Sequence, residues 1–411
     1  MDKHIPQGYK DSPLGIIPKE WEVKRLGDLG SFKNGLNFSP NDSGISYYFL
    51  GVGDFLNRNV IDVRNLGHIH LKDKLDESYL IKDQDLVFVR SNGSKSLVGR
   101  SVLIKSNQEE ATYSGFCIRF RSDNKCTTTK YIQHLINVGY LKRFLVYEGR
   151  GTNITNLNQD ILGRLSFPIP PIAEQDRVLH ILSIWDTAIE KQSELIEKFK
   201  LRKRALMQQL LTGKKRLPGF SREWKRIKAG DIFMSSSVRG KRSEVLLSAT
   251  QEHGVIPRDQ LEGRVTMPTG NLESFKLVEV GDFVISLRSF QGGIEYSEHR
   301  GIVSPAYTVL KPVKEIDKSF YRFYFKSTDL IGHLAIAVIG IRDGKQISYE
   351  DFCFVKIPYP RIEEQKAISA ILIQAEKEIE LANEKLICLQ SQKRGLMQQL
   401  LTGKIRTTNF E

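Results

Sequence analysis

The nine-residue sequence LMQQLLTGK occurs twice in this chain, at residues 206–214 and again at residues 396–404. Upstream of each copy, the pattern Pro-x-Pro-x-Ile-x-Glu-Gln recurs at the same distance, beginning at Pro168 and at Pro358. The two segments stay in register without a gap over the whole stretch that joins these motifs. A chain of 411 residues with such a repeat is predicted to be a duplicated unit rather than one domain.

Each repeated segment is predicted to form one long helix. Proline followed by glutamate suits a helix start, and Gly213 and Gly403 suit the position just after a helix end. In between, apolar residues alternate at spacings of four and three, the heptad pattern of paired helices. The larger apolar residues of this seam are Leu182, Trp185, Ile189, Ile196, Phe199, Leu206 and Leu210 in the first helix, and Leu372, Ile379, Leu386, Leu389, Leu396 and Leu400 in the second.

The two helices are predicted to pair with each other in antiparallel orientation. Lys203 and Lys393 occupy the same seam position, so parallel pairing would place two ammonium groups side by side. Antiparallel pairing instead brings them near Ala375 and Trp185, where a lysine stem can lie over alanine and an ammonium group over an indole ring. The alternative, in which each helix pairs with a different chain, stays open at this point.

The net charge of +13 is concentrated outside the helices: residues 1–170 carry +5 and residues 213–358 carry +6. These two blocks resemble each other weakly, for example in Asp85–Arg90 and Asp282–Arg288. Short β-branched runs between turns, with one helix-prone stretch near 130–147 and another near 319–336, are typical of an α+β domain. We therefore expect two pseudo-symmetric α+β domains separated by two long antiparallel coiled-coil helices. The expected order is a first domain at 1–168, a helix at 169–213, a second domain at 214–358, a helix at 359–405 and a tail at 406–411.

Two basic domains held apart by nearly neutral helices suit a long polyanion such as double-stranded DNA. In each domain, polar loops with arginine and amide side chains follow a strand or precede the long helix. Arginine can pair with guanine, and asparagine or glutamine with adenine. The candidate DNA-binding residues are Arg90, Asn92, Ser94, Lys95, Arg150, Thr152 and Asn153 in the first domain, and Arg288, Gln291, Arg342, Lys345 and Gln346 in the second.

Motifs of the common enzyme classes are missing from the sequence. There is no Gly-rich cofactor loop and no phosphate loop, and Pro170-Pro171 lacks the Asp or Asn and the aromatic residue of an amino-methyltransferase motif. The four cysteines form no CxxC pair, so no metal site is expected. No apolar run is long enough to cross a membrane, and the N-terminus lacks a signal core. These observations predict a cytoplasmic binding protein that is not an enzyme, binds no cofactor itself and does not contact a membrane.

The Pro-x-Pro-x-x-x-Glu-Gln start and the Leu-Leu-Thr-Gly-Lys end, present twice, resemble the specificity subunit of type I restriction–modification enzymes, as does the entry sequence from Gly15 to Asp28. The resemblance implies two target-recognition domains, each reading one half of a bipartite, asymmetric DNA site. It also implies that the helices set the spacing and dock two methylation subunits, and that restriction subunits join the complex. S-adenosylmethionine, ATP and Mg²⁺ would then belong to the partner subunits.

Two further expectations follow from the duplicated pattern. Met207 and Met397, with the adjacent glutamine pairs 208–209 and 398–399, lie off the seam and are expected to present one surface to two copies of a partner. The start and the end of the chain are expected to lie close together. Two alternative functions remain at this stage: the specificity arm of another restriction system, and a coiled-coil scaffold without sequence-specific DNA binding.

Overall fold

The computed structural model describes residues 5–37, 44–56, 59–91, 97–123, 126–140, 143–144, 157–241, 243–251, 253–261, 272–286, 293–337 and 348–407. The chain divides into two compact units, Met1–Lys191 with Leu386–Glu411, and Gln192–Lys385. The first unit contains the first basic block, the beginning of α4 (Ile172–Leu210) and the end of α8 (Ile362–Leu400). The second unit contains the other block with the remaining parts of both helices. The units therefore divide each long helix, whereas the boundaries expected from the sequence gave each helix a segment of its own.

The first unit is built on a five-stranded sheet with the order β4-β11-β8-β9-β6, together with a three-stranded sheet β10-β5-β7 and the pairs β1-β2 and β12-β3. Its strands are β1 (Tyr9–Lys10), β2 (Ile17–Pro18), β3 (Glu22–Arg25), β4 (Gly30–Asn34), β5 (Ile45–Leu50), β6 (Val60–Asp62), β7 (Gly67–Leu71), β8 (Leu86–Val89), β9 (Ser101–Lys105), β10 (Ala111–Tyr113), β11 (Cys117–Ser122) and β12 (Ser166–Ile169). Its shorter helices are α1 (Thr129–Asn137) and α3 (Gln159–Arg164), with 3-10 turns at Leu26–Asp28, Val52–Phe55, Val63–Asn65 and Glu77–Tyr79.

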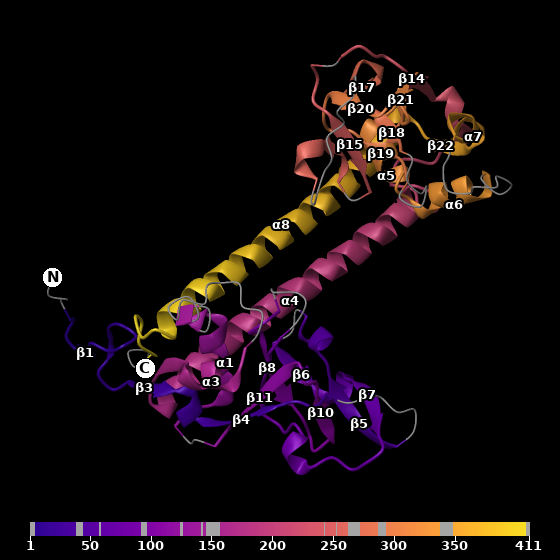
Figure 1. Cartoon of the computed structure of the whole chain (residues 1–411). Helices are drawn as coiled ribbons and strands as arrows, with labels where there is room; N and C mark the ends of the chain where they lie inside the picture. Colours follow the sequence, from indigo (N-terminus) through magenta and orange to yellow (C-terminus); the bar gives the residue numbers. More distant parts are fainter. Residues whose placement is uncertain are drawn as a thin grey trace. The chain divides into compact units, whose positions relative to one another are not determined.

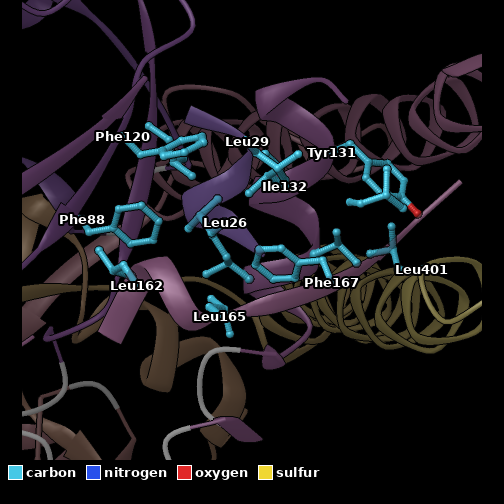
Figure 2. Close-up of a cluster of buried hydrophobic side chains, with 14 of the residues drawn as sticks. Leu26, Leu29, Phe88, Phe120, Tyr131, Ile132, Leu162, Leu165, Phe167 and Leu401 are labelled. Atoms are coloured by element: carbon cyan, nitrogen blue, oxygen red, sulfur yellow. The ribbon is translucent and has the colours of Figure 1, made fainter. Parts of the chain in front are cut away.

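Strand β8 explains why residues 86–89 are apolar without alternation. Successive side chains of a strand point to opposite faces, and both faces of β8 are buried. Leu86 and Phe88 pack into one hydrophobic cluster, while Val87 and Val89 pack into another. The first of these clusters is drawn in Figure 2, where Leu401 from the segment after α8 lies in the same core as Tyr131 of α1. Leu182 of α4 and Leu400 of α8 belong to the same cluster, so the long helices are part of the domain core.

The second unit repeats this plan with fewer strands. Its sheet has the order β14-β21-β18-β19, accompanied by the pairs β15-β16, β17-β20 and β13-β22. The strands are β13 (Lys225–Lys228), β14 (Phe233–Ser236), β15 (Leu247–Thr250), β16 (Gly254–Pro257), β17 (Lys276–Val278), β18 (Phe283–Ile285), β19 (Glu295–Tyr296), β20 (Gly301–Val303), β21 (Thr308–Pro312) and β22 (Lys356–Tyr359). The shorter helices are α5 (Lys318–Tyr324), α6 (Thr328–Ala337) and α7 (Tyr349–Phe354), with 3-10 turns at Ala229–Asp231, Arg258–Gln260 and Leu272–Ser274. Figure 1 labels most of these strands and the three helices along the chain.

The two sheets share the motif β4-β11-β8 and β14-β21-β18, which confirms the predicted duplication of an α+β domain. In both, the middle strand is antiparallel to each neighbour. One detail of the prediction is wrong. The single helix expected over 319–336 is two helices, because the hydroxyl of Ser327 donates to the carbonyl oxygen of Tyr324 (2.6 Å) and accepts from the amide of Leu330 (3.4 Å), which begins a new helix.

Helices α4 and α8 pair in antiparallel orientation, because contacts inside each unit join the start of one to the end of the other. Val178 and Leu182 of α4 lie with Leu400 of α8 in the cluster of Figure 2, called the first core from here on. The main hydrophobic cluster of the second unit, called the second core, contains Leu210 of α4 with Ile368 and Leu372 of α8. Among the seam residues, Leu182, Ile196, Leu210, Leu372 and Leu400 are buried, and Trp185, Ile189, Phe199, Leu206, Ile379, Leu386, Leu389 and Leu396 are half-buried. The idea that each helix pairs with another chain is therefore wrong.

The seam lysines bind carboxylates instead of the groups expected from the sequence. Lys203 Nζ lies 2.6 Å from Glu376 Oε1, and Lys393 forms an ion pair with Asp186. Both acidic residues directly follow the expected neighbours Ala375 and Trp185, so the antiparallel register is close to the predicted one. The predicted contact between a lysine and the indole ring of Trp185 is wrong, because an ion pair with the adjacent carboxylate takes its place.

The repeated Glu-Gln at each helix start fastens the helix to its domain. Glu174 is 2% exposed and accepts from the indole Nε1 of Trp21 (2.9 Å) and from the guanidinium of Arg406 (2.8 and 3.0 Å). Glu364, also 2% exposed, accepts in the same way from Trp224 (2.9 Å) and Arg216 (2.8 Å twice). We call these the first and second glutamate clamps. Because Trp21 and Arg406 meet in the first clamp, the beginning and end of the described chain pack together, as expected.

The glutamines that follow the clamp glutamates fix the same helix starts. Gln175 donates through Nε2 to the carbonyl oxygens of Pro170 (2.8 Å) and Cys126 (2.7 Å). Gln365 donates to the carbonyl oxygen of Pro360 (2.8 Å) and accepts from the amide of Asp317, the residue before α5 (2.8 Å). Each repeated Glu-Gln pair thus connects the long helix with the strand before it and with a shorter helix of the domain.

The repeated helix ends also pack into the domains. Gly213 and Gly403 follow the helices with φ of +72° and +71°, the left-handed conformation expected of a helix-terminating glycine. Met397 is 8% exposed in the first core, and Met207 packs against the second. The expectation that the methionines face outward is therefore wrong, because each helix end packs on the domain as well as on its partner helix. The glutamine pairs 208–209 and 398–399 are exposed.

Candidate nucleic-acid interface

In the first unit, the described residues that flank two of the candidate DNA-binding loops meet where several strands end at one side of the five-stranded sheet, which we call the edge. The amide of Arg90, just after β8, donates to the carbonyl oxygen of Phe116 in the turn before β11 (2.8 Å). The carbonyl oxygen of Arg90 in turn accepts from the amide of Leu157 (2.8 Å), which leads into α3. The segments around residues 90, 116 and 157 therefore meet at one place, although they are far apart in sequence.

The end of β4 joins the same edge. The Asn34 Oδ1 atom accepts a hydrogen bond from the Gln159 side-chain amide (3.0 Å), and the amide of Gly115 donates to the carbonyl oxygen of Leu36 (2.7 Å). Asn34 and Gln159 are half-buried, and each retains further donors or acceptors beyond this bond. The sequence interpretation missed both, because neither lies in a Gly-rich or Arg-containing loop. The pairing of β4 with β11 places Asn34 here, and the hydrogen bond between Leu157 and Arg90 brings Gln159 beside it.

Of the twelve candidate DNA-binding residues, Arg90 is the one that the structure describes, and it is half-buried at this edge. Its backbone holds the edge together through the two hydrogen bonds given above. The others, namely Asn92, Ser94, Lys95, Arg150, Thr152, Asn153, Arg288, Gln291, Arg342, Lys345 and Gln346, lie outside the described residues. Their assignment stays a prediction.

The second unit has an equivalent edge. Strand β18 leads to Ser286, and the turn Ser304–Ala306 precedes β21 just as Ser114–Phe116 precedes β11. In both turns the serine Oγ accepts from the amide two residues later, at 3.2 Å in the first unit and 3.3 Å in the second. The edges therefore share a backbone design and differ in side chains.

Two cations border the second edge. Lys276 Nζ donates to the carbonyl oxygen of Tyr307 (2.6 Å), directly after the turn. Partial burial lowers the pKa of Lys276, and the nearby positive charge of Arg239 lowers it further. An anion placed here would relieve that repulsion, so a DNA phosphate suits this position.

Part of the positive charge in the first unit has a structural role. Arg119 is 5% exposed and donates to the carbonyl oxygen of Ser78 (3.1 Å), and its burial lowers its pKa. Arg121 forms an ion pair with the buried Asp85 at 2.6 Å, and this hydrogen-bonded carboxylate raises the pKa of Arg121. These two arginines of β11 stabilise the sheet, so net charge alone overstates the charge available for a ligand.

Within the described residues, no three His, Cys, Asp or Glu side chains are grouped so that they could hold a metal ion. The helices of this part of the chain include none that is long and apolar enough to span a membrane. What the two units offer is a pair of loop-bearing sheet edges, with polar and cationic groups of the kind that contact DNA bases and phosphates.

Comparison with known proteins finds relatives that match almost the whole chain. The family model described as the type I restriction modification DNA specificity domain matches residues 18–198 and again 221–390. The MjaX type I restriction enzyme specificity subunit of Methanocaldococcus jannaschii is 25% identical over 97% of both chains, and the MjaVIII specificity subunit of the same organism is 24% identical over 100% of this chain and 99% of its own. A solved chain from a study of complex assembly and conformational transition in a type I R-M system has the same fold, with a TM-score of 0.62, 15% identity, and coverage of 95% of this chain and 99% of that one.

Proposed function

The chain belongs to the type I restriction–modification DNA specificity family, and on this premise we propose that each of its two units reads one half of a bipartite, asymmetric DNA site. The observation that carries the proposal is the pair of equivalent sheet edges. They share strand order and turn geometry, but Phe116 of the first corresponds to Ala306 of the second. Two edges with the same backbone geometry and different side chains suit two domains that recognise two different half-sites.

The long helices have two roles in this proposal. They set the distance between the two half-sites, since helices of 39 residues each extend about 58 Å. They also dock two methylation subunits, one at each repeated helix end. The identical exposed glutamine pairs 208–209 and 398–399 support this role, because two copies of one partner require the same surface twice.

The chain itself acts in recognition and carries no catalytic step. Transfer of a methyl group from S-adenosylmethionine belongs to the methylation subunits, and ATP- and Mg²⁺-dependent cleavage belongs to the restriction subunits that join the complex. The proposal of a scaffold between chains is less well supported, because α4 and α8 contact each other inside each unit.

The test is an exchange of one reading domain. Residues 25–165 are replaced by the corresponding segment of a family member that recognises another site, while both glutamate clamps and both helices are kept. The hybrid is combined with its methylation subunits, and the methylated sites are mapped. We expect one half-site to change while the other half-site and the gap stay the same. A change in both halves would contradict the proposal that each unit reads independently.

A further inference from the structure

Phe116 is the one exposed Phe, Tyr or Trp side chain among the described residues of the first unit, with 57% of its surface accessible. It lies at the centre of the sheet edge described above, where the ends of β4 and β8 and the segment entering α3 meet. We call this edge the reading edge. All the other aromatic side chains described in this unit are buried or half-buried. An exposed phenyl ring at this polar surface can supply a large apolar contact that the neighbouring amide groups cannot supply.

The turn that carries Phe116 is held in place from several sides. The amide of Phe116 donates to Ser114 Oγ (3.2 Å), and its carbonyl oxygen accepts from the amides of Arg90 (2.8 Å) and Ser91 (3.4 Å). The amide of Ser114 donates to the carbonyl oxygen of Leu50 (3.0 Å). A side chain on a fixed turn loses little conformational freedom on binding, which favours a specific contact.

The neighbourhood of Phe116 is polar and close-packed. A Cβ atom on Gly115 would lie 2.0 Å from Asn37 Oδ1, so a larger residue here would require the asparagine side chain to move. Asn37 itself is exposed, and Asn34 and Gln159 form the amide pair described above. Amides at such an edge can hydrogen-bond to base edges, whereas the phenyl ring can only make an apolar contact. The apolar group that a base edge presents in the major groove is the 5-methyl group of thymine.

We propose that Phe116 is a specificity-determining residue that contacts the 5-methyl group of one thymine in the half-site read by the first unit. This inference rests on the proposed function and assigns one of its contacts. Ala306, with a much smaller apolar side chain, occupies the equivalent position of the second unit, so a contact with a phenyl ring is absent there. The two units thus differ in chemistry at one structurally matched position.

The experiment compares thymine with deoxyuridine, which differs only in lacking the methyl group. The probe is the duplex of the mapped site, with the thymines of the first half-site replaced one at a time. The protein is the full chain in complex with its methylation subunits, as wild type, as Phe116→Ala, as Phe116→Leu and as the control Phe354→Ala. Phe354 is 71% exposed on α7 of the second unit, outside the reading edge.

Wild type is expected to bind one deoxyuridine duplex about fourfold more weakly than the thymine duplex, which corresponds to one methyl group removed from water. The Phe116→Ala complex should bind the thymine duplex about tenfold more weakly and no longer distinguish the two duplexes. Phe116→Leu should keep most of the discrimination, because it keeps an apolar contact. Phe354→Ala should behave as wild type, and thymines of the second half-site should respond equally in wild type and in Phe116→Ala.

Three results would overturn the inference. The Phe116→Ala complex could retain the full deoxyuridine penalty at every thymine. Wild type could show no penalty anywhere while Phe116→Ala still binds weakly, which would indicate insertion of the ring between base pairs. Phe116→Ala could also bind as tightly as wild type. A wild-type complex without preference for any bipartite duplex would instead refute the proposed function, so the two failures are distinguishable.

Discussion

Loss of the Glu174 charge in the first glutamate clamp is predicted to lower the free energy of unfolding and to loosen both ends of the described chain. In Glu174→Gln the shape of the side chain is kept, but its negative charge is lost. The carboxylate accepts one hydrogen bond from Trp21 and two from Arg406, and the side chains of Glu174 and Arg406 are 2% and 17% exposed. Removing the buried charge leaves the guanidinium with only the exposed carboxylate of Glu20 (3.0 Å) as counter-charge, which costs about 3 kcal/mol.

The assay is urea unfolding of the full chain combined with amide hydrogen exchange of residues 5–25 and 401–407. We expect a loss of about 3 kcal/mol in the unfolding that includes the first unit, and faster exchange in both segments. The double variant Glu174→Gln with Arg406→Met should lose less than the sum of the two single changes, because both remove the same ion pair. The matched control is Glu22→Gln, since the ion pair of Glu22 with Lys24 (2.7 Å) is on the surface and contributes little. A Glu174→Gln variant as stable as the control would refute the reasoning.

Further predictions concern the core, pH, DNA binding and the helices. Leu401 is fully buried in the first core, so Leu401→Ala should lower the free energy of unfolding by about 3 kcal/mol, whereas the exposed neighbour Gln399→Ala should leave it unchanged in the same denaturant melt. Burial lowers the pKa of His134 to about 4 from 6.5, so between these pH values the imidazole is protonated in the unfolded chain and neutral in the folded one. The free energy of unfolding should therefore fall by about 2 kcal/mol from pH 7.5 to pH 5. In His134→Leu the unfolding midpoint should depend less on pH over this range. Duplex affinity of the assembled complex should fall with salt with a logarithmic slope of about −5 or steeper, and a slope near zero in a titration series would contradict phosphate contacts. Inserting one heptad at matched positions of α4 and α8, about 10 Å, should lengthen the mapped gap by about three base pairs.

The features predicted well from sequence are those with a strong local period or a repeat. The heptad seam and the helix-ending glycines determine α4 and α8 almost completely, because a helix face and a terminal turn depend on neighbours within a few residues. The sequence predicts where along the partner helix Lys203 and Lys393 lie, but not that each of them binds a carboxylate. Asp186 and Glu376 lie one residue beyond the seam, and only the packed structure shows that a lysine stem reaches them.

The clamps and the reading edges depend on contacts that no local pattern contains. Trp21 and Arg406 are separated by almost the whole chain and meet only because both pack at the start of α4. The sequence of the Glu-Gln repeat therefore indicates only a helix start, whereas Glu174 also binds the guanidinium and indole groups of these distant segments. The sequence does not indicate Phe116, Asn34 or Gln159 for the same reason, since their proximity follows from strand pairing and from long-range hydrogen bonds rather than from sequence spacing.

The central claim is that two unlike units of one chain read two half-sites at a fixed separation. Methylation mapping in cells that carry this chain with its partner subunits tests it most directly. The account predicts one asymmetric motif made of two short specific parts around a gap of constant length and unspecified sequence. A continuous motif, two identical half-sites or a gap of variable length would contradict it.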